Sequence, residues 1–117
     1  MPVGSDGDYK QVGLAFAKAL ATRDYDVAYA LTSRDYRDST SVKALQAAFE
    51  SIVPVDWKTV GPIEVGGTME DWPGREPSDV GWAYVSVGGD EYSEAVTVVV
   101  TLEEGELRVR TVEFGRP

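Results

Sequence analysis

The chain has 117 residues, a formal net charge of −9, and neither cysteine nor histidine. This length fits one domain, so we expect residues 1–117 to form a single domain, with 1–7 as a flexible arm. The composition excludes disulfides and thiolate catalysis, lacks the commonest metal ligand and opposes phosphate binding, so we expect no metal, no cofactor and no nucleic-acid partner.

Apolar residues at helical spacing predict three helices in the first half of the chain. Asp24 fits the N-cap of the second helix, and Pro54 fits the end of the third. Gly13 weakens the first helix by about 1 kcal/mol against alanine, which indicates close packing against another segment. The expected ranges run from a cap at Ser5 or Asp6 to about Thr22, from Tyr25 to about Leu31, and from Val42 to Ile52.

Residues 33–41 separate the second and third helices and are polar and turn-prone. We expect a loop there, with a short edge strand over 35–37 as the alternative. The triplet Arg34-Asp35-Tyr36 repeats Arg23-Asp24-Tyr25. Two interpretations stay open: Tyr36 forms an acid–base pair with Asp35 or Asp38 at a pocket mouth, or the aspartates only cap helices and turns.

Alternating apolar residues predict four strands in the second half. Leu107 and Val109 have odd numbers but Val112 and Phe114 have even ones, so a bulge near Arg110-Thr111 would bring all four onto one face and bend the sheet. Arg108 and Arg110 then offset neighbouring acids such as Glu94 and Glu113. The expected strands are about 57–65, 80–87, 95–102 and 107–114, with a loop over 66–79 and turns at 88–90 and 103–105.

Helices followed by strands imply an α+β fold, with three N-terminal helices packed on a bent antiparallel sheet of about four strands. The segments that carry this pattern are Gly13–Leu20, Asp24–Leu31, Val42–Ile52 and the long final hairpins. In this order of elements the chain resembles the nuclear-transport-factor-2-like superfamily, also called the cystatin-like cone.

The resemblance implies a cone-shaped domain but no single function, because the superfamily includes isomerases, dehydratases, cyclases, transport and scaffold proteins and bacterial immunity proteins. Several of its enzymes use an Asp–His or a Tyr–Asp pair in the pocket. The first is out of reach here because the chain has no histidine. No catalytic residue is carried over to this chain.

Two groups of residues are candidates for a site. Trp82 and Tyr84 alternate onto one strand face, where they either line a ligand pocket or form sheet core beneath the helices. The loop over 66–79 carries Trp72 among acids, either as an anchor for a partner protein or as a lid folded over the sheet edge. The pocket prediction comprises Tyr29, Asp35, Tyr36, Trp82 and Tyr84; the partner-binding prediction comprises Glu70, Asp71 and Trp72.

Charge and surface pattern favour a partner protein over a substrate. Residues 54–117 hold thirteen acids and five bases, for −8 of the total charge, whereas 1–53 contribute only −1. An acidic face speeds encounter with a basic protein, although it also serves plain solubility. We expect a non-enzymatic domain, immunity-type or regulatory, that binds a partner or dimerises through an exposed face of Thr97, Val99 and Thr101.

The alternative function is a small-molecule carrier or an isomerase- or cyclase-like enzyme with a cone pocket, in which Asp35 is desolvated against aromatic rings. The N-terminal sequence lacks a signal-peptide pattern, and no apolar run reaches the roughly 20 residues that span a bilayer. We therefore expect a cytoplasmic protein without membrane contact.

Overall fold

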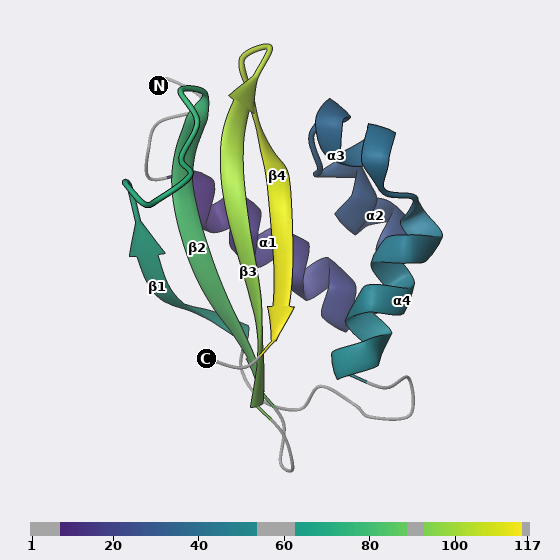
Figure 1. Cartoon of the computed structure of the whole chain (residues 1–117). Helices are drawn as coiled ribbons and strands as arrows, with labels where there is room; N and C mark the ends of the chain where they lie inside the picture. Colours follow the sequence, from purple (N-terminus) through teal and green to yellow (C-terminus); the bar gives the residue numbers. More distant parts are fainter. Residues whose placement is uncertain (1–7, 54–62, 89–92, 116–117) are drawn as a thin grey trace.

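The computed structural model describes residues 8–53, 63–88 and 93–115 as four helices followed by a four-stranded antiparallel sheet (Figure 1). The expected arm over 1–7, the caps at Ser5 or Asp6, the strand start over 57–62 and the turn at 89–90 lie outside these described residues. The helices are α1 (Asp8–Ala21), α2 (Tyr25–Ala30), α3 (Arg34–Ser39) and α4 (Val42–Ile52). The strands are β1 (Ile63–Met69), β2 (Asp79–Gly88), β3 (Ser93–Glu103) and β4 (Glu106–Gly115), paired in the order β1-β2-β3-β4.

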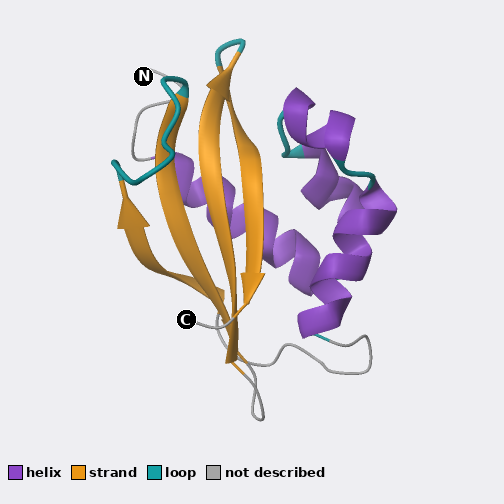
Figure 2. Cartoon of the chain, in the orientation of Figure 1, coloured by secondary structure: helices purple, strands orange, loops and turns teal. Residues whose placement is uncertain are grey.

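The predicted α+β class, with helices before strands, is confirmed. Figure 2 shows α1 crossing behind the sheet while α2, α3 and α4 gather beside β4. We call the sheet face toward α1 the inner face and the opposite one the outer face. The inner face forms the core with α1 and α4, and its buried members include Ala83, Val85, Val87, Val96, Val98, Val100 and Val109.

Helix α1 packs closely on the inner face, as its glycine indicated. A Cβ placed on Gly13 would lie 3.2 Å from Cγ2 of Val98 and 3.3 Å from Cβ of Ala83, so a larger residue would require these neighbours to shift by a few tenths of an ångström. The chain leaves α1, which ends at Ala21, through Arg23, whose φ of 65° is left-handed. The Arg23 amide donates to the Leu20 carbonyl and the Asp24 amide to the Ala19 carbonyl, the two bonds of a Schellman motif.

Residues 34–39 form helix α3, so the expectations of a loop or an edge strand there, and of only three helices, were wrong. The Ser33 side chain caps this helix by accepting a hydrogen bond from the Tyr36 amide at 3.2 Å. No residue of α3 is buried, so apolar spacing gave no signal for it. Strand-like pairing occurs just before the helix, where Thr32 bridges to Val109 of β4.

Helix α4 has the predicted bounds, and Ser41 caps it by accepting a hydrogen bond from the Ala44 amide at 3.1 Å. Leu45 and Phe49 are its buried residues. The bulge predicted near Arg110-Thr111 is also present: Val99 pairs with Thr111 and Val100 with Val109, which leaves Arg110 as the extra residue. The β3–β4 turn is tight, with positive φ at Glu104 and Gly105.

Strand β1 differs from its prediction because it continues past Val65 to Met69. The residues expected to begin the loop instead pair with β2, since Gly67 lies opposite Tyr84 and Met69 opposite Trp82. A bulge at Gly66 makes this possible, and a Cβ there would lie 3.3 Å from the Tyr84 ring. The loop between β1 and β2 therefore covers only residues 70–78; we call it the Trp72 loop.

Gly81 supplies a test of the α1–sheet contact. A Cβ at this position would lie 2.4 Å from Cδ2 of Tyr9, whose ring is buried on the glycine. We expect Gly81→Ala to lower the free energy of unfolding by about 1–3 kcal/mol through overpacking, as measured by urea unfolding. In a Tyr9→Leu background the same change should cost less, because the ring it strikes is gone. Equal losses in both backgrounds would contradict this account.

No helix in the described part of the chain is both long and apolar enough to cross a membrane.

Candidate functional site

Trp82 and Tyr84 lie on the outer face, so the interpretation that they form sheet core beneath the helices was wrong. They pair with Val99 and Thr97 of β3, are half-buried, and do not belong to the core that the helices cover. A bulge moves Val80 out of this alternation, because Asp79 pairs with Thr101 and Gly81 with Val100. Val80 packs against the core, although strict alternation along the strand would place it on the same face as Trp82 and Tyr84.

The outer face carries a hollow of about 310 Å³, which we call the outer groove. Strand residues form most of it and the Trp72 loop forms one wall. Its apolar surface comes mainly from two tryptophans, and its polar rim includes both a cation and a carboxylate. The lining residues are Trp72, Pro73, Gly74, Trp82, Thr97, Val99, Arg110, Thr111 and Glu113.

Val99 and Thr101 are only 7% and 6% exposed, and Thr97 is half-buried. The prediction that these three residues form an exposed dimerisation surface is therefore wrong for Val99 and Thr101. Val99 lies beside Trp82 in the ladder and in the same groove as Trp72, so larger aromatic groups of the same chain surround it.

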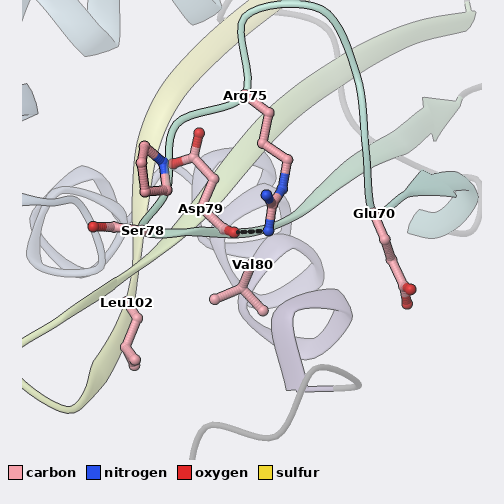
Figure 3. Close-up of a pocket in the computed structure, with 7 residues that line it drawn as sticks. Glu70, Arg75, Ser78, Asp79, Val80 and Leu102 are labelled. Carbon is pink, nitrogen blue, oxygen red and sulfur yellow. Dashed lines mark hydrogen bonds between the residues drawn. The ribbon is translucent and has the colours of Figure 1, made fainter.

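The Trp72 loop folds back on itself and onto the sheet, which is the position expected of a lid that places Trp72 over the sheet edge. The Arg75 amide donates to the Trp72 carbonyl at 3.2 Å, and the Arg75 guanidinium carbon lies 5.8 Å from the Trp72 ring centroid. The same guanidinium donates through Nη2 to the Asp79 carbonyl at 2.7 Å (Figure 3). Trp72 is half-buried, while Glu70 and Asp71 beside it are exposed.

A second depression, of about 540 Å³, lies between the Trp72 loop and the start of β2 (Figure 3). Its lining mixes loop residues with the exposed Leu102 of β3, which is 46% accessible. The buried carboxylate at the edge of this depression belongs to Asp79. Because it forms an ion pair with Arg110, it is not available as an acid or base. The lining residues are Glu70, Arg75, Pro77, Ser78, Asp79, Val80 and Leu102.

Asp79 and Arg110 form a bidentate ion pair beside the outer groove. Arg110 donates through Nε to Oδ1 at 2.7 Å and through Nη2 to Oδ2 at 2.6 Å, and the Glu76 amide donates to Oδ2 at 2.8 Å. The Asp79 side chain is fully buried and that of Arg110 is 19% exposed. Burial alone raises the pKa of Asp79, but hydrogen bonds from Arg110, the Glu76 amide and Thr101 outweigh burial and lower that pKa below its ordinary value.

This pair corrects the expected charge partners on β4. Arg110 binds Asp79 and, at 3.3 Å, Glu76, rather than Glu94 or Glu113. Arg108 contacts Glu106 and donates to the Ala30 carbonyl at 2.7 Å.

Of the five residues of the predicted pocket, Trp82 lines the outer groove, while Tyr29, Asp35 and Tyr36 come from helices α2 and α3 and make contacts of their own. The Tyr29 hydroxyl donates to the Thr40 carbonyl at 2.8 Å, which ties α2 to the start of α4. Tyr36 packs against the core. Burial raises the pKa of its hydroxyl, and the nearby Tyr29 raises that pKa further. Asp35 is exposed rather than desolvated. After the larger effect of Asp79, its negative charge also helps to raise the pKa of Arg110.

Within the described residues, no cluster of three or more carboxylate, histidine or cysteine groups could hold a metal ion. Comparison with known proteins finds no match to this chain among protein-family models, curated proteins or solved structures. The geometry of the outer face therefore carries the functional argument alone.

Proposed function

We propose that this protein is a non-enzymatic, acidic domain that binds a segment of a basic partner protein in the outer groove. The observation that carries the proposal is the position of Trp72, Trp82 and Tyr84. All three are large, half-buried aromatic side chains: Trp72 of the loop and Trp82 of β2 line the outer groove, and Tyr84 follows Trp82 on the same face of β2, which the described helices do not cover. Aromatic anchors of this kind supply much of the energy in protein–protein contacts.

The charges around the groove favour a basic partner. Glu113 lies on its rim, and the exposed acids Glu70 and Asp71 precede Trp72 in the loop. The cation of the groove, Arg110, is already neutralised by Asp79 and Glu76. Complementary charge raises the rate of association and weakens with salt, so binding should be strongest at low ionic strength.

The partner-binding residues predicted from the sequence enter this proposal in altered form. Trp72 contributes a wall of the groove rather than a projecting anchor. Glu70 and Asp71 contribute negative charge at its approach. An immunity-type or regulatory protein, which neutralises a basic partner, is the class of function that fits this arrangement.

We further propose that the chain is a divergent relative of the nuclear-transport-factor-2-like superfamily. The order of helices before strands supports this, as do three bulges, at Gly66, Val80 and Arg110, along a meander that packs on α1. Bulges bend strands, so their presence in β1, β2 and β4 favours the bent sheet that the resemblance implies.

Trp82→Ala supplies the test of the binding proposal. We expect it to weaken partner binding by about 2 kcal/mol, roughly thirtyfold, because a central aromatic anchor is removed. The immobilised protein would first capture proteins from a lysate of the source organism at low salt. The affinity of any captured partner would then be measured for the wild type and the variant by calorimetry.

Val27→Ala is the matched control, since Val27 is an apolar residue of α2 that is 50% exposed and does not line the groove. It should bind like the wild type. Circular dichroism would show that both variants are folded. A partner held equally well by the Trp82→Ala variant would overturn the outer groove as the binding site.

A further inference from the structure

We propose, building on the binding function above, that the outer groove receives one cationic side chain of the partner, a lysine or an arginine. Its charge would lie against the rings of Trp72 and Trp82 and be balanced by the Glu113 carboxylate. The three groups come from the Trp72 loop, β2 and β4 respectively, and all line the same hollow.

The aromatic part of the argument rests on the two tryptophans. Indole faces attract cations more strongly than other aromatic rings do, over distances up to about 6 Å. Trp72 already has a cation on its ring in this protein, because the Arg75 guanidinium carbon lies 5.8 Å from its centroid. Trp82 has no such cation within the described part of the chain, so its half-buried ring is open to one from a partner.

The charge part rests on Glu113. Its side chain is exposed and forms no hydrogen bond or ion pair within the described residues. Arg110, on the same rim, is held by both oxygens of Asp79 and contacts Glu76. Among the charged residues that line the groove, the unpaired charge is therefore negative. The Arg75 guanidinium lies on the Trp72 ring but does not line the groove, so an incoming cation meets the open ring of Trp82 and the Glu113 carboxylate.

The dimensions agree with a single side chain. A volume of about 310 Å³ lies at the lower end of the range for small-molecule pockets, roughly 300–1,000 Å³. The apolar surfaces of Trp82 and Val99 suit the methylene stem of lysine or arginine, which packs well on apolar groups while its charged end stays polar. Thr97 and Thr111 add polar groups along the same hollow.

The test uses the full chain with small probes, N-acetyl-arginine methylamide and N-acetyl-lysine methylamide, followed by NMR of the indole N–H resonances. The citrulline analogue is the matched neutral probe. The indole resonance that disappears in a Trp82→Phe variant assigns the Trp82 signal of the wild type. We expect both cationic probes to shift the Trp82 resonance in a saturable way, and citrulline to have little effect.

Glu113→Gln should weaken binding of the cationic probes about twofold to fivefold, the range of an exposed ion pair. Asp38→Asn removes one exposed carboxylate from α3, outside the groove, and should leave the affinity unchanged. This control separates the local effect of Glu113 from the loss of one negative charge.

Equal shifts with citrulline and arginine would overturn the cationic specificity, and equal weakening by both substitutions would overturn the role of Glu113. The absence of any probe effect, while a captured partner remains sensitive to Trp82→Ala, would overturn this inference and leave the binding function intact. A partner insensitive to Trp82→Ala would instead overturn the binding function in this groove.

Discussion

Asp79→Asn is expected to lower the free energy of unfolding at pH 7 by about 3 kcal/mol, the lower end of the range for breaking a buried ion pair. The reason is the charge left behind, since Arg110 is 19% exposed and loses the carboxylate that binds both its Nε and Nη2. An asparagine also lacks the second acceptor oxygen for the Glu76 amide. Urea unfolding followed by circular dichroism measures the loss.

The pH dependence of this loss follows from the pKa of Asp79. Because hydrogen bonds hold that pKa below its unfolded value, which is about 3.9, the ionised carboxylate stabilises the fold above the unfolded pKa. This stabilisation is lost as the pH falls through the lowered pKa of the folded state. The difference between wild type and the Asp79→Asn variant should therefore be constant from pH 5 to 8, and shrink below about pH 4.

Further variants show whether the loss comes from the uncompensated charge. Glu106→Gln breaks the surface contact with Arg108 and should cost no more than about 1 kcal/mol. Asp79→Leu should cost much less when combined with Arg110→Met than when made alone, because apolar replacement of both partners leaves no buried charge. A double variant as unstable as the sum of both single ones would contradict the account.

The ion pair also links stability to the proposed function. The Asp79 carboxylate accepts a hydrogen bond from the Glu76 amide, and the Asp79 backbone carbonyl accepts one from Arg75. The Arg75 guanidinium in turn lies over the Trp72 ring. Arg110, its charged partner, lines the outer groove. Loosening this pair should therefore disturb the position of Trp72 before the core itself is affected.

The elements that were predicted well from the sequence are those whose residues pack directly in the core. Helix α4 has a clean apolar spacing through Leu45 and Phe49, and its predicted bounds were correct. The shift from odd to even apolar positions in β4 located the bulge at Arg110. Gly13 was correctly predicted to mark a close approach. In each case a local sequence pattern reflects how the residues must pack in the core.

The elements predicted poorly depend on contacts made elsewhere. Helix α3 has a capping serine but no buried residue, so spacing could not reveal it. Alternation along β2 separated two faces but could not tell which face α1 covers, and the bulge at Val80 moved that residue into the core. Trp82 and Tyr84 were therefore placed on the wrong side of the sheet.

The candidate site shows the same limit. Asp79 was grouped with a surface loop, yet its partner Arg110 lies 31 residues further along the chain and buries it. No local pattern joins two such residues. The outer groove likewise exists only because the Trp72 loop folds onto β2, β3 and β4, so sequence spacing identified Trp72 and Trp82 separately but not as neighbours.

Phe49→Ala is expected to lower the free energy of unfolding by about 3–5 kcal/mol, the usual range for removing a buried phenylalanine. Phe49 is fully buried, and its ring centroid lies 6.0 Å from that of Phe114 in an edge-to-face arrangement. The Arg23 guanidinium carbon lies 5.2 Å from the same centroid. One ring thus joins α4 to β4 and to the turn that ends α1, while Leu45 is the other buried residue of the helix.

Since small domains are stable by only about 5–15 kcal/mol, such a loss removes a large part of the total. Phe49→Leu should cost less because it keeps most of the buried apolar surface, and Lys43→Ala, on the exposed side of α4, should change stability by no more than about 0.5 kcal/mol. Hydrogen exchange adds a local measurement, in which the α4 amides of the Phe49→Ala variant lose more protection than those of β2 and β3. A loss below about 1 kcal/mol, within the reach of an ordinary surface change, would mean that α4 is held to the sheet by contacts other than this ring.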